Sequence, residues 1–206
     1  MHAMDGGRDP EGHPPTKGAL RASGARERIL EAAYSLFSRH GIRLVGIDAI
    51  ISEADVAKAT LYHHFPSKDA LVLAFLDLRE QRWTYGWLKA EAERTAADPA
   101  DRAVAVFDAL DAWFHRPDYE GCSFINTLLE IADRDDPIHE ATVRHLAAVR
   151  GVVERFAEQA AVKDARETAY QVQILMMGAI VSASRGDLDA ARRARSLVVS
   201  LLAGSR

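Results

Sequence analysis

The sequence predicts an all-α protein of about nine helices, in which an N-terminal helix-turn-helix DNA-binding domain precedes a larger helical domain. Apolar residues recur at three- and four-residue spacing through most of the chain after residue 24, which is the period of an amphipathic helix. No stretch of useful length alternates apolar and polar residues as a strand would. Two short helical segments flank a tight turn near residue 55, an arrangement typical of a helix-turn-helix.

The composition fits one or two small folded domains. The 206 residues are 48% hydrophobic and 27% charged, so the chain can bury a sizeable core. No apolar run approaches the length of a membrane span, and the polar N-terminus lacks the apolar core of a signal peptide. The single cysteine, Cys122, excludes an internal disulfide and suits a reducing compartment. We therefore expect a soluble, cytoplasmic protein without a membrane partner.

The charge is unevenly distributed along the chain. The formal net charge is −4, yet residues 17–68 carry a net +3 and residues 69–206 a net −5. A small basic module on an acidic body indicates that one domain binds an anionic partner such as nucleic acid. The asymmetry is small and also fits an ordinary solvated surface.

The N-terminal third divides into a tail and a three-helix domain at 25–68. Residues 1–24 are rich in Gly, Pro and charge, which predicts a flexible tail with a basic end. Helices are expected at 25–40, 47–54 and 56–64. Four cations near the tail's end could reach phosphate or a minor groove, although a solvated segment is the favoured interpretation. They are Lys17, Arg21, Arg26 and Arg28.

The remaining residues, 69–206, are expected to form one larger domain for ligand binding and dimerisation. Apolar stripes at helical spacing predict six further helices. They lie at 69–94, 99–114, 122–133, 137–160, 165–184 and 188–202. Pro137 suits the first turn of a helix.

The helix expected at 56–64 carries the most informative side chains. Val56, Leu61 and Phe65 have the spacing of an inward face. The outward side chains are cationic, hydroxylic or aromatic, namely Lys58, Thr60, Tyr62 and His63. Side chains of these kinds contact phosphates and base edges in protein–DNA complexes.

Residues 25–71 contain core and exposed residues that fit one motif at the same time. They are Ala32, Ala33, Leu36, Phe37, Gly41, Ile50, Ala54, Thr60, Leu61, Tyr62, His63, His64, Phe65, Ser67, Lys68 and Leu71. With these residues the segment resembles the DNA-binding domain of the tetracycline-repressor (TetR) family of bacterial transcriptional regulators. The resemblance implies a homodimer that binds double-stranded DNA at a palindromic operator, most commonly as a repressor.

The expected DNA contacts follow from this resemblance. Lys58 is expected to donate to a phosphate or a guanine edge, while Ala59 and Thr60 are short enough to approach base edges. Contacts to the phosphate backbone are assigned to Gly46, Tyr62, His63 and Lys68.

The sequence departs from the family pattern around the two short helices. Gly46 stands where a Thr or Ser usually opens the second helix, although its backbone N–H still suits an anion. Asp55 and Ala57 stand at the ends of a turn that is usually Gly-Val-Ser, and Ala59 replaces a common Gly. Asp tolerates a left-handed turn, whereas Ala57 lacks an N-cap hydroxyl, at a cost of about 1 kcal/mol. We expect altered or weaker operator preference, with DNA binding retained.

The resemblance also implies that the later helices bind a small effector. An apolar lining with a few polar anchors is usual for such a site, and a hydrophobic or aromatic effector is preferred. Individually, most of the candidates are as readily explained as core residues. The candidates are Trp87, Phe107, Trp113, Cys122, Phe124, Asn126, Glu130 and Met176. No metal-ligand spacing or cofactor motif is found, so neither a metal nor a cofactor is expected.

The last two helices are the expected dimer interface. Small residues among apolar ones let helices approach closely, and two helices from each subunit would form a four-helix interface. The alternative is burial inside one subunit, which the periodicity does not exclude. The interface candidates are Tyr170, Ile174, Met177, Gly178, Val181, Leu188, Ala191, Val198 and Leu201.

Two other functional classes are alternatives to a ligand-released repressor. The first is a DNA-binding regulator controlled by oxidation or by a partner, in which Cys122 near a helix N-terminus is the reactive thiol. A small buried packing residue is the favoured interpretation of that cysteine. The second is an enzyme, which nothing supports because the sequence shows no nucleophile–base pair, nucleotide loop or metal motif.

Overall fold

The computed structural model describes residues 24–204, and over this range it contains helices and no strand. The elements are α2 (Ala25–His40), α3 (Ile47–Ala54), α4 (Lys58–His64), α5 (Lys68–Arg79), η1 (Glu80–Lys89), α6 (Ala90–Thr95), η2 (Pro99–Asp101), α7 (Arg102–Phe114), α8 (Ser123–Glu130), α9 (Pro137–Gln159), α10 (Ala165–Ser184) and α11 (Ala190–Gly204). Because α5, η1 and α6 are continuous and η2 leads directly into α7, the described residues form nine helical rods. The all-α prediction is confirmed. The tail predicted at 1–24, with Lys17 and Arg21, lies almost entirely outside the described residues.

The three N-terminal helices, which we call the head (residues 25–64), pack around one small core. Ile29, Phe37, Ile50 and Leu61 supply side chains that are at most 2% exposed. Phe37 also makes an edge contact with Phe75 of α5, with ring centroids 5.4 Å apart. The core of the head therefore continues into the rest of the molecule, which we call the body (residues 68–204).

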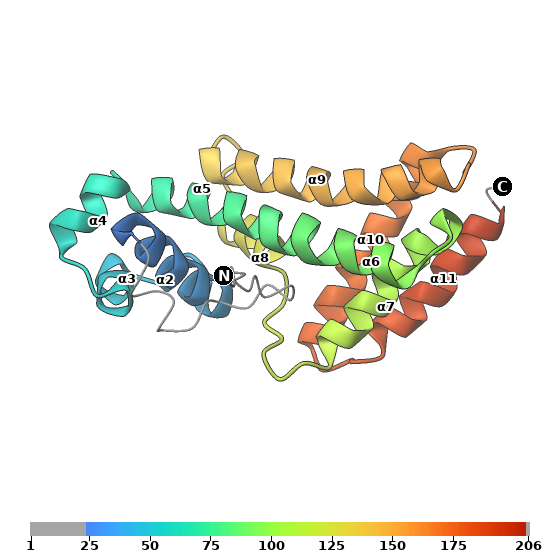
Figure 1. Cartoon of the computed structure of the whole chain (residues 1–206), viewed down its shortest axis with the longest axis horizontal. Helices are drawn as coiled ribbons and strands as arrows, with labels where there is room; N and C mark the ends of the chain where they lie inside the picture. The colour runs from blue at the N-terminus through green and yellow to red at the C-terminus, as the bar shows by residue number, and fades with distance from the viewer. Residues whose placement is uncertain (1–23, 205–206) are drawn as a thin grey trace, which may run out of the picture.

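A single long helical rod, made of α5, η1 and α6, joins the head to the body (Figure 1). It begins where the Ser67 hydroxyl accepts a hydrogen bond from the Ala70 amide at 3.0 Å, a typical N-cap. The predicted helix at 69–94 is thus confirmed. Its middle segment, η1, is a π-helix, whose i→i+5 bonds add one residue to each turn. Trp83 and Leu88, five residues apart, are both buried there.

The body places its other helices along and beyond this rod. Figure 1 shows α9 running beside the rod and α7, α10 and α11 gathered at the end far from α4. α9 packs against α5 and α10, whereas α7 packs against α6 and α11. Large fully buried side chains fill the space between them, among them Phe107, Phe114, Phe124 and Phe156. Among the described helices, none has the length and apolar character needed to cross a membrane.

Three predicted helix boundaries are corrected by the structure. The helix predicted at 56–64 begins at Lys58, because the amide of Val56 is still bonded to the Ile51 carbonyl of α3, at 3.2 Å. The helix predicted at 122–133 is limited to Ser123–Glu130, since Ile131 has extended backbone angles. The last helix spans Ala190–Gly204 rather than 188–202.

Candidate nucleic-acid interface and effector cavity

The turn between α3 and α4 keeps a helix-turn-helix geometry without a glycine. Asp55 ends α3 in the left-handed conformation, with φ 51° and ψ 57°. Its amide donates to the Ser52 carbonyl at 3.4 Å, and the next amide, that of Val56, donates to Ile51. These two bonds close the end of α3 in the manner of a left-handed C-cap. Asp is among the few residues other than glycine that adopt this conformation readily, so the predicted survival of the turn is explained.

The recognition helix α4 turns one face to the core and another to solvent. Leu61 is fully buried, and Phe65, which follows the helix, is 3% exposed. On the other face the side chains predicted to contact DNA are exposed, apart from half-buried Thr60; they are Lys58, Ala59, Tyr62 and His63. Gly46 is exposed at the N-terminus of α3, and Lys68 is half-buried at the start of α5.

Two of the cations considered for phosphate contacts have structural partners in the head. The Arg26 guanidinium lies 5.0 Å from the centre of the Phe65 ring, a cation–π distance. Arg28 Nε donates to the Ala54 carbonyl at 3.3 Å, which satisfies an end carbonyl of α3. Arg26 and Arg28 therefore link α2 to the end of α4 and to α3, respectively; we call α3 and α4 the reading helices.

An acidic residue that the sequence reasoning missed lies beside the recognition helix. Asp48, in the first turn of α3, is 3.4 Å from Lys58 Nζ, and both side chains are strongly exposed. An exposed pair of this kind contributes little to stability. Its importance lies in placing a negative charge on the surface that was predicted to meet phosphates.

Glu130, predicted to line the effector pocket, instead connects the body to the head. Its Oε2 accepts a hydrogen bond from the Arg43 amide at 2.7 Å. A Cβ atom on Gly41 would collide with the same carboxylate, and Gly41 has φ 79°. The end of α8 therefore lies close to the loop between α2 and α3, where the positive φ of Gly41 favours glycine.

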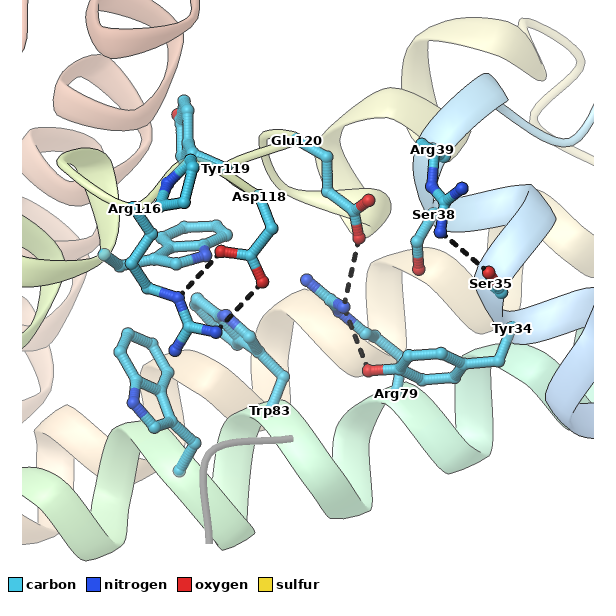
Figure 2. A pocket seen from close by; sticks show the side chains of 13 residues that line it. Tyr34, Ser35, Ser38, Arg39, Arg79, Trp83, Arg116, Asp118, Tyr119 and Glu120 are labelled. Carbon is cyan, nitrogen blue, oxygen red and sulfur yellow. Dashed lines mark hydrogen bonds and ion pairs between the residues drawn. The ribbon is translucent and has the colours of Figure 1, made fainter. Parts of the chain in front are cut away.

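A cavity of about 480 Å³ opens between the head and the body. Figure 2 shows its lining side chains, which come from α2, the long rod, α7 and the loop after α7. They are Tyr34, Ser35, Ser38 and Arg39 on α2; Arg79, Trp83 and Trp87 on the rod; Trp113 on α7; and Arg116, Pro117, Asp118, Tyr119 and Glu120 in the loop. The volume is typical of small-molecule sites.

The apolar part of the cavity is built from the three tryptophans of the chain. Their ring centroids are 5.4 to 5.8 Å apart. The planes are tilted by 43° to 58°, so the rings do not cover one another by stacking. Tyr119 extends this aromatic wall, with its ring 4.9 Å from that of Trp113.

The polar part of the cavity centres on Arg79, whose side chain is only 7% exposed. Arg79 Nη1 donates to the Tyr34 hydroxyl at 2.9 Å, while the Glu120 carboxylate is 3.9 Å away (Figure 2). Asp118 is held more tightly, accepting from Arg116 at 2.9 and 3.0 Å. Burial raises the pKa of the Glu120 carboxyl, although Arg79 and Arg39 act in the opposite direction.

Two of the eight predicted pocket residues, Trp87 and Trp113, line this cavity. Phe107, Phe124 and Met176 are at most 2% exposed and belong to the hydrophobic core. Asn126 is half-buried in the first turn of α8, and its backbone N–H donates to the Cys122 carbonyl.

Cys122 is also outside the cavity lining. It is 5% exposed, and burial raises the pKa of its thiol. A reactive thiol needs a lowered pKa and access to solvent, so the structure favours the packing role for this residue.

Arg79, the buried charged residue of the cavity lining, was not predicted from the sequence. Val72, Leu76 and Trp83 are buried on the same stripe of the long rod, and Arg79 falls at their helical spacing. An arginine in the middle of an apolar stripe was therefore the available signal. Tyr34 and Glu120 carried no comparable signal, because their approach to Arg79 depends on the tertiary fold.

The helices predicted to form the dimer interface carry an exposed apolar stripe. On α10, Tyr170, Ile174 and Val181 are 38%, 68% and 46% exposed. Gly178 is exposed and Met177 half-buried on the same side. Leu188 before α11 is 40% exposed, Leu201 is half-buried, and Leu197, which was not predicted, is 57% exposed.

Two other interface candidates lie inside the subunit. Ala191 and Val198 are fully buried, on the side of α11 that packs against α7 and α10. Their side chains therefore have no surface left for contact with a second copy. For these two residues the alternative interpretation, burial inside one subunit, applies. Over residues 24–204, no group of three or more His, Cys, Asp or Glu side chains is arranged to hold a metal ion.

Comparison with known proteins matches both parts of this architecture. Residues 29–75 match the family model of bacterial regulatory proteins of the tetR family, and residues 99–198 match the C-terminal domain model of tetracyclin repressor-like proteins. The chain belongs to the TetR family. It is therefore a DNA-binding transcriptional regulator, in a family of regulators rather than enzymes.

Individual relatives agree with this assignment. The HTH-type transcriptional regulator LmrA of Bacillus subtilis is 27% identical over 161 residues, which are 76% of this chain and 85% of LmrA. The HTH-type transcriptional regulator UidR of Escherichia coli is 39% identical over 61 residues, which are 30% of this chain and 31% of UidR. The crystal structure of SCO4454, a TetR-family regulator from Streptomyces coelicolor, superposes with a TM-score of 0.77 at 29% identity, covering 88% of this chain and 95% of that one.

Proposed function

We propose that this TetR-family protein is a dimeric repressor that leaves a palindromic operator when a small molecule occupies the cavity between head and body. The observation that carries the proposal is the mixed lining of the cavity. Tyr34, Ser38 and Arg39 belong to α2, which supports the reading helices, while Arg79 and the tryptophans belong to the body. A molecule bound there would contact both parts at once, so it would bind their arrangements with different affinity. Such a difference is what a ligand needs to shift a conformational equilibrium.

In this proposal DNA meets the exposed face of α4 and the N-terminus of α3. Lys58 donates to a phosphate or a guanine edge, and Ala59 and Thr60 approach the bases. Tyr62, His63 and Lys68 contact the backbone, together with the free amide at Gly46. A helix of seven residues reads few base pairs, which is why two copies on a palindrome are needed for selectivity. A partner on the chromosome places the protein in the cytoplasm.

The proposed dimer buries the exposed apolar stripe of α10 together with Leu197 and Leu201. Large apolar side chains exposed along one helix face are typical of an interaction surface. A second copy would cover them with the same stripe, as in a two-fold interface. This arrangement leaves α3 and α4 free at the other end of the molecule (Figure 1).

Three polar contacts give the cavity a route to the reading helices. Arg79 bonds Tyr34 of α2, and Arg82 forms a paired salt bridge with Glu31 of the same helix. Glu130 holds the loop that leads into α3. A shift of the body at the cavity is thereby passed to α2 and to the position of α4, and in a dimer it changes the separation of the two reading helices.

The proposal is tested by fluorescence anisotropy on DNA taken from beside the protein's own gene, over a salt series. The Lys58→Ala, Tyr62→Ala double variant should lose selective binding, and the salt slope should fall by about 2 because a dimer loses two lysine charges. A matched double variant, Lys163→Ala with Tyr85→Ala, removes an exposed lysine and an exposed tyrosine elsewhere in the body and should bind as the parent does. Equal binding of the parent protein to operator and random DNA would contradict the proposal.

A regulator controlled by oxidation is the alternative, and the burial of Cys122 counts against it. The Cys122→Ser variant separates the two ideas in the same anisotropy assay. If peroxide released the parent protein from DNA but not this variant, the thiol would be the sensor and the ligand-released repressor would be contradicted. We expect neither protein to respond to peroxide.

A further inference from the structure

Building on the proposed effector site, we propose that the cavity selects an aromatic carboxylate, with its rings against the tryptophans and its carboxylate on the Arg79 guanidinium. Arg79 and Trp83 are four residues apart on the same rod, so both side chains leave one face of the helix. Figure 2 shows them entering the cavity from the same side. The apolar and anionic parts of one small molecule could therefore be bound together.

The aromatic preference follows from the three tryptophans. Trp83, Trp87 and Trp113 surround one region of the lining at centroid distances below 6 Å without stacking on one another. Aromatic rings interact with such walls through offset or edge contacts that add to simple burial. A flexible aliphatic chain would lose more conformational freedom for the same contact area.

The preference for an anion follows from hydrogen-bond donors that lack full partners. Arg79 is 94% buried, as its 6% exposure shows, yet its nearest carboxylate oxygen, from Glu120, is 3.9 Å away and beyond hydrogen-bond distance. Trp83 Nε1 is buried without a hydrogen-bond partner among the described residues. A buried donor without an acceptor is costly, so an acceptor oxygen that reached Trp83 Nε1 would relieve that cost. A carboxylate would in addition form charge-assisted hydrogen bonds with the Arg79 guanidinium.

The charges around the cavity argue against a cationic aromatic ligand. The lining holds Arg39, Arg79 and Arg116 against Asp118 and Glu120, which leaves a net positive charge. Asp118 is already bound by two nitrogens of Arg116. An amine would have to displace this pair and approach Arg79.

The same geometry links recognition to control. Arg79 donates to the hydroxyl of Tyr34, which stands on α2. A carboxylate bound to Arg79 would draw the guanidinium toward itself and away from Tyr34, and it would repel the Glu120 carboxylate. The bond between the rod and α2 would then weaken when the ligand arrives, which is the direction required for release from DNA.

Three probes with the same rings test the inference on the full-length protein: diphenylacetate, diphenylacetamide and diphenylethylamine. All three tryptophans lie on the cavity, so quenching of intrinsic fluorescence reports binding directly. The acid should bind roughly tenfold to a hundredfold more tightly than the amide, the range expected for charge-assisted hydrogen bonds, and the amine should bind most weakly. Equal binding of acid and amide, a preference for the amine, or no quenching by the acid would overturn the inference.

Variants locate the anion site and keep the test valid if one of them fails to fold. Arg79→Met should bring the acid down to the affinity of the amide, Trp83→Phe should weaken the acid severalfold, and Glu120→Gln should strengthen it. Arg144→Met removes an exposed arginine of α9 outside the cavity and should change nothing. An acid preference that survives Arg79→Met, or an acid affinity that neither Trp83→Phe nor Glu120→Gln changes, would refute the assigned site.

A parallel anisotropy titration separates this inference from the proposed function. If the acid binds with the expected preference but leaves the operator complex intact, the ligand class stands and the release mechanism fails. If the amide and the amine release DNA as well as the acid does, release through the cavity stands and the preference for an anion fails.

Discussion

At the scale of single residues, the two reading helices combine groups of opposite effect. Lys58 at the start of α4 is proposed to contact DNA, yet in the free protein its Nζ lies 3.4 Å from a carboxylate oxygen of Asp48. The carboxylate must be moved away from the phosphates or tolerated close to them. We therefore expect Asp48 to weaken binding to any DNA sequence, most strongly at low ionic strength.

The variant Asp48→Asn should accordingly bind operator DNA more tightly. We expect a gain of roughly two- to fivefold per subunit at low salt, the range for an exposed charge pair, and a smaller gain at high salt. Anisotropy across a salt series measures both. Glu53→Gln, which removes an exposed acid near the other end of α3, is the control for net charge. A loss of affinity in Asp48→Asn without loss of helix content would contradict this role.

Glu120 makes a second prediction, in the dependence of stability on pH. Its pKa is raised by burial, so the folded chain holds this proton to a higher pH than the unfolded chain does. The free energy of unfolding therefore falls as the pH rises from the ordinary glutamate pKa, about 4.3, through the raised value. Glu120→Gln cannot ionise and should gain in melting temperature, relative to the parent protein, as the pH is raised from about 4 to neutrality. A difference that shrinks over this range would show that the ionised carboxylate is stabilised in the fold.

Some residue positions could be predicted from the sequence, whereas others could not. Thr60, Leu61 and Tyr62 occur in a short contiguous motif, so local spacing was enough to place them on the correct faces of α4. Glu130 and Arg79 act through partners that are distant in sequence, on the loop after α2 and on Tyr34. No periodicity contains such information, because it depends on how the helices pack.

At the scale of secondary-structure elements, the longer helices of residues 24–204 were predictable from regular apolar stripes, and α3 and α4 from a short motif. The exceptions have local causes. The backbone amides of Asp55 and Val56 are hydrogen-bonded to carbonyls of α3, so α4 begins later than predicted. The π-helical segment η1 was not predicted, since the spacing of its buried residues overlaps with that of an α-helix. It carries Trp83 and Trp87, and π segments often occur at functional sites.

The apolar stripe of α10 gives a prediction for that element. Ile174 is 68% exposed, so Ile174→Glu should leave the subunit folded while placing a charge in the proposed interface. We expect the dimer to dissociate at least a hundredfold more readily, as for an unpaired charge buried in an apolar interface. Sedimentation velocity over a concentration series measures the effect. Val143→Glu, at an exposed position on α9, should remain dimeric, and equal dissociation of both variants would argue against the α10 interface.

At the scale of the whole molecule, one hydrophobic core runs from the head through the long rod into the body. The head is therefore held by packing at Phe75 and by polar contacts at Arg79, Arg82 and Glu130. The cavity lies within this junction, whereas Phe107, Phe124 and Met176, which were predicted to line a pocket, lie in the hydrophobic core. We propose that a ligand in this junction changes the position of the head relative to the body.

The most direct test of this account fills the cavity without any ligand. Ser38 is 4% exposed and lines the cavity from α2, so Ser38→Phe would place a ring in the space that the effector is proposed to occupy. His40→Phe adds the same ring at an exposed position at the end of α2 and serves as the control. Tryptophan fluorescence would show whether the new ring has entered the cavity.

The deciding measurement is the operator affinity of the folded Ser38→Phe dimer. We expect binding roughly fivefold to a hundredfold weaker than that of the parent protein and of His40→Phe, the range of typical coupling between two sites. If the ring fills the cavity and the operator affinity remains that of the parent protein, the cavity does not control the reading helices.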